Sequence, residues 1–290
     1  MKKGVLFALL TAFFFVTLEP VTKLIANDVT PYAITFWRFV IGGVILLPFA
    51  ISKIKKNNIK ISLKDFGMMA LWGIIFICIS MIALQVSIKK ADSPAVISII
   101  FSANSIFTII FAAFILKEKV TRNKVIALVL GVMGVLICAD FSKGTNMMSI
   151  ALAVFSAVSF SLYTVVSRKY VAKYGSGVQA CVVFFSGSFV LLIALLILGI
   201  DVTPTMNTGV LLKLGYTGIC VTGMGYMCYF MAIEKGGAIM ASLSYFIKPI
   251  LTPFVTWAIN DITPNVNVFI AVILIVGASY FATLKKKEEK

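Results

Sequence analysis

Apolar runs of about 20 residues follow one another along nearly the whole chain, and they limit its fold more than any other feature. A helix of that length crosses the hydrocarbon core of a bilayer, which is roughly 30 Å thick. Such runs must be helical, because a helix satisfies its own backbone hydrogen bonds in lipid. Only 13% of the residues are charged, against about 25% in a soluble domain. The sequence therefore predicts an all-α polytopic membrane protein.

Ten membrane-spanning segments can be placed in the 290 residues, and the short connections between them leave no room for a soluble domain. The segments are predicted at roughly residues 4–26, 31–51, 66–87, 93–116, 123–140, 148–168, 177–199, 209–233, 237–259 and 265–284. The first segment begins like a signal peptide, with Met1-Lys2-Lys3. Because it is long, contains Glu19 and lacks a clear small-residue cleavage site, we expect a retained helix.

Basic residues are distributed unevenly between the two predicted sides of the membrane. The net charge is +15, and nineteen of the 26 lysines and arginines fall on the side of the N-terminus, with five on the other. This asymmetry follows the positive-inside rule and predicts that both termini lie in the cytoplasm. We therefore expect a multi-pass protein of the cytoplasmic (inner or plasma) membrane. Because the positive charge reports topology here, no nucleic-acid partner is predicted.

The two halves of the chain match each other at an offset of about 145 residues. Ala12–Lys23 lies over Ala157–Arg168, and Ser87–Lys90 lies over Ala232–Lys235. Each half has five predicted helices, so the second half enters the membrane from the opposite side. Inverted-topology repeats of this kind build a central cavity that is reached alternately from each face.

We therefore predict two five-helix repeats, at residues 4–140 and 148–284, around a central cavity. The alternative is that two hydrophobic halves look alike through composition alone. The short charged loops at equivalent positions favour a repeat.

Three stretches carry a resemblance to a known family: Trp37-Arg38-Phe39, Leu116–Thr121 (LKEKVT) and Ala232–Pro249 (AIEKGGAIMASLSYFIKP). With these stretches the chain resembles the drug/metabolite transporter (DMT) superfamily, specifically the ten-helix exporters built from two EamA domains. The resemblance implies secondary active transport by alternating access. Two positions depart from the family pattern, because Lys248 stands where an acidic residue is commoner and Asn260-Asp261 replaces the usual Gly-Glu pair.

Three charged side chains lie well inside predicted membrane helices: Glu19, Arg38 and Lys248. A charge at the bilayer centre costs at least about 2.5–3.5 kcal/mol, so each is expected to face a partner or a wet cavity. At about 1.5 Å per residue, Glu19 and Arg38 share a level roughly 10 Å from one membrane face, and Lys248 lies roughly 7 Å deeper. We expect a bidentate pair between Glu19 and Arg38, with Lys248 within reach.

The three charges sum to one positive charge, which predicts an anionic group such as a substrate carboxylate at Lys248. Two alternatives remain for Lys248: burial deprotonates its ammonium group, or a structural ion pair holds it to Glu19. A third alternative is proton or counter-ion coupling at Glu19. This role is implied by the positional resemblance to a glutamate in the first helix of the smaller four-helix multidrug exporters of the superfamily.

Prolines beside two of these charges predict hinges at Pro20, Pro249 and Pro253. Each proline removes a backbone hydrogen bond from its helix, and the freed carbonyl needs a protein or water partner. Further polar and aromatic side chains are expected to line the substrate cavity: Asn104, Gln85, Tyr163, Tyr226, Tyr229 and Tyr245. Each can also have a purely structural role, because hydroxyls often bond their own helix and tyrosines often anchor helices at the membrane interface.

These features together predict a secondary active transporter that exports a small amino acid or a related carboxylate-bearing metabolite. Lys248 and Arg38 are expected to hold the carboxylate, with Glu19 near the amine. The predicted partners are an anionic or zwitterionic small molecule and membrane lipid. The alternatives are a proton-coupled multidrug or cation exporter that uses Glu19, and a lipid-handling protein whose cavity opens sideways to the bilayer.

An enzyme is not predicted. The chain has no histidine, its five cysteines show no metal-ligand spacing, and Glu19 is the one clearly intramembrane acid. Intramembrane hydrolysis or group transfer needs paired carboxylates, a metal cluster or a nucleophile with its base. No catalytic residue, metal or cofactor is therefore predicted. A monomer and a homodimer both fit the sequence.

Overall fold

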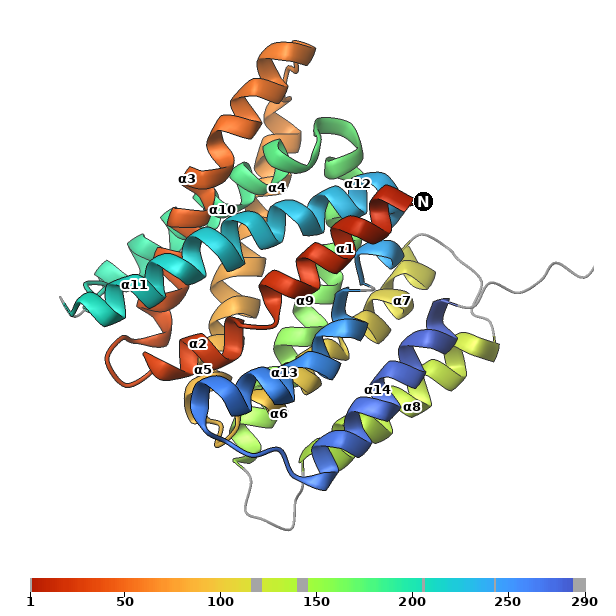
Figure 1. Cartoon of the computed structure of the whole chain (residues 1–290). Coiled ribbons are helices and arrows are strands. Elements are labelled where there is room, and N and C mark those ends of the chain that lie inside the picture. The colour runs from red at the N-terminus through yellow and green to blue at the C-terminus, as the bar shows by residue number, and fades with distance from the viewer. Residues whose placement is uncertain (1, 116–121, 140–145, 205–206, 243, 284–290) are drawn as a thin grey trace, which may run out of the picture.

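The computed structural model describes residues 2–115, 122–139, 146–204, 207–242 and 244–283, and helices form nearly all of this part (Figure 1). In chain order the helices are α1 (Lys2–Phe15), α2 (Leu18–Leu24), α3 (Pro31–Asn57), α4 (Leu63–Ile74), η1 (Ile75–Met81), α5 (Ile82–Lys90), α6 (Pro94–Ser102), α7 (Asn104–Ile115), α8 (Arg122–Ala139), α9 (Met147–Tyr174), α10 (Ser176–Ile197), α11 (Thr208–Tyr216), η3 (Thr217–Gly225), α12 (Tyr226–Ser242), α13 (Ser244–Asn260) and α14 (Val266–Thr283). Within these residues, seven helical stretches are long and apolar enough to cross a membrane, and Val266–Ala278 is a shorter apolar stretch. The protein is thus the all-α, multi-pass membrane protein that the sequence predicts.

Prolines act differently in the first and ninth predicted spans. The first span is interrupted at Val16 and Thr17, between α1 and α2. Pro20 lies in the first turn of α2. A backbone N–H at this position would have no acceptor within the helix, so proline removes no helical hydrogen bond there. By contrast, α13 continues through both Pro249 and Pro253. A helix break therefore lies beside Pro20, whereas neither Pro249 nor Pro253 interrupts its helix.

Helix borders differ from the predicted ones where charged or small residues continue a helix. α3 runs on to Asn57 and α9 to Tyr174, because backbone hydrogen bonding continues into their lysine-rich ends after the apolar run has stopped. α12 does not end near residue 233 but extends to Ser242. Residues 234–242 contain no proline, so no helical N–H is missing there. The predicted ninth span is therefore divided between the end of α12 and α13.

Helix packing follows the same pattern in both halves of the chain. α3 packs on α10, and α8 packs on α14; each pair joins equivalent segments of the two halves. α1 packs on α12 while its counterpart α9 packs on α5, and α3 packs on η3 while its counterpart α10 packs on α4. Figure 1 shows α8 and α14 together at one edge, and α1, α9 and α13 in the middle. Exchanging the halves preserves these contacts, as in a fold built from two inverted repeats.

Close helix contacts rest on glycines at matching positions. Gly42 and Gly187 lie 145 residues apart in the sequence, as do Gly73 and Gly218. A Cβ added at Gly73 would lie 2.6 Å from a backbone carbonyl oxygen of α10, and one at Gly218 would lie 2.6 Å from a side chain of α3. Each of these two spans also contains a π-helical segment, because η1 follows Gly73 and η3 contains Gly218. Small residues at these sites let the helix backbones approach closely.

One end of the bundle is held by charged side chains from several helices. Lys53 of α3 lies 3.4 Å from Glu234 Oε1 of α12, and Glu234 Oε2 accepts the Ser176 N–H of α10 at 3.0 Å. Beside them, Lys173 of α9 forms a 2.5 Å ion pair with Asp65 of α4. This is the end at which the sequence predicts the cytoplasm.

The opposite end is held by a lysine and backbone carbonyls. Lys23, in the last turn of α2, donates to the carbonyl oxygens of Lys89 at 3.2 Å and of Ala91 at 2.5 Å, where α5 ends. A cation at a helix C-terminus is also favoured by the helix dipole. The LKEKVT motif, Leu116–Thr121, lies outside the described residues.

Candidate functional site

Glu19 and Lys248 form a buried ion pair between the two halves of the chain. Lys248 Nζ lies 2.5 Å from Glu19 Oε1, and the side chains are 1% and 0% exposed, respectively. α2 supplies the carboxylate and α13 supplies the ammonium group. Removing one partner of such a pair leaves an uncompensated buried charge, which typically costs roughly 3–5 kcal/mol. The two charges therefore hold the halves together in this conformation.

Arg38 does not form the expected ion pair with Glu19. Its Nη2 donates instead to Sδ of Met81 at 3.0 Å, and its guanidinium carbon lies 4.6 Å from the centre of the Phe39 ring. Depth along a helix does not specify which way a side chain points, because that depends on the rotation of each helix in the bundle. The flexible lysine stem of α13 reaches the carboxylate instead.

A continuous cluster of aromatic rings lies beside Arg38 and Lys248. Neighbouring ring centres lie 4.4 to 6.4 Å apart, and the rings belong to Phe15, Phe39, Phe76, Phe101, Phe160, Tyr163, Phe184, Tyr226, Tyr229 and Tyr245. Lys248 Nζ lies 5.7 Å from the Phe101 ring centre and 6.0 Å from that of Tyr245. These distances are within the range of cation–π interactions, about 6 Å. The cluster therefore places aromatic faces within cation–π range of the Lys248 ammonium group.

Several buried polar atoms of the site have no hydrogen-bond partner among the described residues: Glu19 Oε2, Arg38 Nε and Nη1, Gln85 Oε1, Asn104 Oδ1 and the Tyr245 hydroxyl. Nearly all buried polar groups in proteins are paired, and leaving one unpaired costs about 1–3 kcal/mol. Glu19, Arg38 and Lys248 are each at most 1% exposed, so the site is closed to solvent in this conformation. The site therefore contains buried donors and acceptors that no other described residue satisfies.

Two predicted tyrosines bond to side chains that the sequence did not single out. The Tyr226 hydroxyl donates to Met81 Sδ at 3.5 Å, so it shares that sulfur with Arg38. The Tyr229 hydroxyl lies 3.1 Å from Thr164 Oγ1 of α9. Both tyrosines are buried, which excludes the alternative that they anchor helices at the membrane interface.

Asn104 and Gln85 are also buried, and they lie at the margin of the site. Asn104 begins α7. Its side-chain Nδ2 donates to the backbone carbonyl oxygen of Phe101 at 2.7 Å, and its backbone carbonyl oxygen accepts the Ser161 hydroxyl at 2.7 Å. Asn104 thus bonds the backbone of Phe101, and the ring of Phe101 lies 5.7 Å from Lys248 Nζ. Gln85 lies on α5, one turn after Met81.

The family model described as "EamA-like transporter family" matches the chain twice, at residues 2–139 and at residues 147–284. The chain belongs to the EamA-like transporter family. It is 37% identical to an uncharacterized transporter of Clostridium kluyveri, over 96% of this chain and 92% of that protein. It is also 26% identical to the uncharacterized transporter YdfC of Bacillus subtilis, over 88% of this chain and 83% of that protein.

Two further comparisons concern a solved structure and a relative whose name gives its solute. A crystal structure with 19% sequence identity superimposes on this EamA-like transporter with a TM-score of 0.73, covering 98% of this chain and 97% of the other. The S-adenosylmethionine uptake transporter of Rickettsia prowazekii is 25% identical, over 53% of this chain and 51% of that protein. The family, the two repeats and transport as the activity are therefore established.

Sequence reasoning missed several residues that the fold of this transporter brings to the site. Met81 connects Arg38 with Tyr226, and Gln179 of α10 donates to the Tyr163 hydroxyl at 3.1 Å. A methionine in an apolar helix looks like any other packing residue, so no signal distinguished it. Gln179 had a usable signal, since a glutamine within an apolar span is as unusual as the one at position 85.

Proposed function

We propose that this EamA-like transporter exports a small amino acid or related carboxylate-bearing metabolite by alternating access. The observation that carries the proposal is Arg38, which is fully buried in the closed centre with Nε and Nη1 unpaired. A guanidinium group is the side chain best suited to bind a carboxylate, because it remains charged and presents several donors in one plane.

The balance of charges supports an anionic group beside Arg38. Glu19 and Lys248 neutralise each other at 2.5 Å, which leaves the positive charge of Arg38 uncompensated by that pair. A solute carboxylate would neutralise Arg38, and the unpaired Glu19 Oε2 would accept a hydrogen bond from an amine on the same solute. An α-amino acid carries both groups on one carbon, so it fits these charges.

The contacts at the two ends of the bundle support alternating access. The Lys53–Glu234 contact joins α3 to α12 at one end, and Lys23 joins α2 to the end of α5 at the other. Neither contact involves Glu19 or Lys248, so each can be lost without removing the buried ion pair. Opening one end at a time would expose the centre to one side of the membrane.

The named function of one relative fits the same class of solute. The Rickettsia prowazekii relative is named as an S-adenosylmethionine uptake transporter. S-adenosylmethionine is an amino-acid derivative with an amine and a carboxylate. That relative is named for uptake, whereas the outward direction proposed here rests on the resemblance to EamA exporters. Transport assays with solute loaded on either side of the membrane separate the two directions.

Counterflow in proteoliposomes tests the proposed solute class. Wild type, Arg38→Gln and Arg38→Lys would be compared across labelled amino acids, other carboxylates and matched amides without a carboxylate. We expect counterflow of at least one carboxylate and none of its amide, with a loss of roughly 100-fold in Arg38→Gln and a smaller loss in Arg38→Lys. Lys213→Gln, outside the site, serves as the matched control. Equal transport of acid and amide by wild type would refute a carboxylate site.

A proton-coupled exporter of cations is the second candidate. The unpaired Glu19 Oε2 and the cation–π distances around Lys248 favour it. In that case a hydrophobic cation such as tetraphenylphosphonium would be transported, and a pH gradient would drive it. Carboxylate counterflow with no effect of a pH gradient would instead favour the first proposal.

We also propose that both termini lie in the cytoplasm and that the repeats occupy residues 4–140 and 148–284. The gathering of Lys53, Glu234 and Lys173 at one end of the bundle supports this orientation. A reporter that is active only in the cytoplasm, fused to the C-terminus, should be active.

Coexpression of the two halves, divided between residues 140 and 148, should restore transport if these borders are right.

A further inference from the structure

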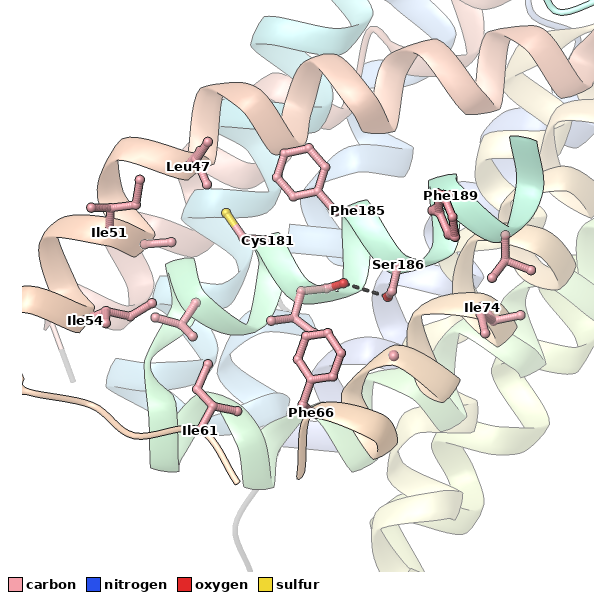
Figure 2. A pocket seen from close by; sticks show the side chains of 15 residues that line it. Leu47, Ile51, Ile54, Ile61, Phe66, Ile74, Cys181, Phe185, Ser186 and Phe189 are labelled. Carbon is pink, nitrogen blue, oxygen red and sulfur yellow. Dashed lines mark hydrogen bonds between the residues drawn. The ribbon is translucent and has the colours of Figure 1, made fainter. Parts of the chain in front are cut away.

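An apolar groove lies on the side of the bundle, away from the candidate functional site. Its volume is about 740 Å³, and α3, α4 and α10 form its walls (Figure 2). The walls are formed mainly by Leu47, Ile51, Ile54, Phe66, Phe185 and Phe189. The hydroxyl of Ser186 donates to the Val182 carbonyl of its own helix at 2.6 Å, so it offers little polarity to the groove. Only an apolar molecule matches such a lining.

The groove opens toward the bilayer rather than toward the candidate site. Phe189 is 64% exposed and Ile51 is 43% exposed, although both lie in helices long and apolar enough to span the membrane. Their neighbour is therefore lipid hydrocarbon. A concave surface holds a flexible chain along its length, whereas a flat helix face only touches it. A lipid acyl chain has the chemistry and the place to occupy the groove.

Three lysines lie next in sequence to, or within two residues of, residues that line the groove. Lys55 follows the lining residue Ile54, Lys60 precedes the lining residue Ile61, and Lys64 lies in the first turn of α4. All three side chains are exposed, and none has an ion-pair partner in the part of the chain that the structure describes. They form a positive rim next to an apolar groove.

The acidic residue nearest in sequence does not neutralise this rim. Asp65 pairs with Lys173 at 2.5 Å and accepts the Tyr174 hydroxyl at 2.6 Å. Lys55, Lys60 and Lys64 therefore remain available to an anion. Clusters of basic residues beside a membrane helix are typical binding sites for anionic headgroups.

We infer that this groove binds an anionic phospholipid, whose acyl chain lies along α3, α4 and α10 and whose headgroup phosphate is held by Lys55, Lys60 and Lys64. This lipid site is separate from the candidate site for the transported solute, and the inference does not depend on the proposed function. Long lysine stems let the charged ends reach a headgroup while the methylene groups remain in the apolar region.

Lipid retention and thermal stability of the full-length protein in detergent test this inference. Phosphatidylglycerol and phosphatidylcholine with identical acyl chains would be titrated, with native mass spectrometry and thermal unfolding as readouts. We expect wild type to retain one phosphatidylglycerol with at least roughly tenfold preference and to show a higher Tm with it. The triple variant K55Q/K60Q/K64Q should lose most of this preference while binding phosphatidylcholine as before.

Two further variants make the result specific. K89Q/K90Q/K213Q removes three lysines from elsewhere in the chain and should keep the preference. Ala70→Trp, which fills the groove, should lower retention of both lipids; if it does not fold, Ile51→Ala and Phe185→Ala should weaken retention by widening the groove.

Four outcomes would overturn the inference. In wild type, equal retention of the two lipids would remove the headgroup site. A stabilisation by glycerol phosphate as large as that by phosphatidylglycerol would show a free-phosphate site without an acyl chain. An equal loss of preference in K89Q/K90Q/K213Q would show a general charge effect. A change from dimer to monomer in Ala70→Trp with unchanged lipid retention would show that the groove contacts a second copy of the chain.

Discussion

The two repeats share one framework but differ in the charges they carry. Gly73 and Gly218 make close helix contacts at matching positions, and π-helical segments lie in both spans. The positions equivalent to Glu19 and Arg38 in the second repeat are Thr164 and Val183, and neither is charged. The framework therefore follows the internal repeat, whereas the site does not.

This difference has a physical reason. Helix packing depends on small residues and on backbone geometry, which a duplicated sequence preserves without cost. A duplicated charge would place a second carboxylate and a second guanidinium in the membrane, each of which needs its own partner. One repeat supplies Glu19 and Arg38 and the other supplies Lys248, so the ion pair also joins the repeats. An asymmetric site suits a solute whose two ends differ in charge.

The largest effect is expected from removing the lysine of this pair. Lys248→Ala leaves Glu19 buried without its partner, so we expect a loss of roughly 3–5 kcal/mol of unfolding free energy. Asn104 is the residue of the first repeat that matches Lys248. Asn104→Ala removes a neutral hydrogen bond, so we expect a loss of only about 1 kcal/mol of unfolding free energy. Unfolding in detergent measures both. The double variant Glu19→Gln/Lys248→Met should recover most of the loss, and equal effects of the two alanine variants would contradict the role of the ion pair.

A smaller effect is expected from the matched glycines. Gly73→Ala brings a methyl group against a backbone carbonyl of α10, while Gly218→Ala brings one against a side chain of α3. Both should destabilise the fold by roughly 1–3 kcal/mol. Gly73→Ala should cost more, because a backbone moves less easily than a side chain. Thermal unfolding of the two variants checks the order, and the reverse order would show that the repeats pack differently from this account.

The smallest effect is expected at the matching positions Glu234 and Lys89. Glu234→Gln weakens the contacts with Lys53 and with the Ser176 N–H, so a loss of about 1 kcal/mol is expected at these partly exposed groups. Lys89→Gln should change stability by less than about 0.5 kcal/mol, because only its backbone carbonyl contacts Lys23. Adding salt should weaken wild type more than Glu234→Gln. If salt affects both alike, the charge of Glu234 does not contribute.

The sequence predicted more about the spans than about the contacts between them. Apolar runs located the membrane helices, and the offset of 145 residues identified the repeat. The borders were wrong where α12 continued to Ser242, because hydropathy reports the apolar run and not backbone hydrogen bonding. Met81 and Phe101 were missed for a related reason. In the sequence, a methionine or phenylalanine of a binding site cannot be distinguished from one that only packs in the core.

That Glu19, Arg38 and Lys248 lie within apolar helices followed from the sequence, because long apolar runs surround each of them. Which charges meet was decided only by the tertiary structure. The rotation of α2, α3 and α13 about their axes depends on packing between distant segments, and it directs Glu19 to Lys248 and Arg38 to Met81. Hydrophobic length and the internal offset thus determined a membrane protein of two repeats, the family resemblance predicted transport, and helix packing determined the geometry of its centre.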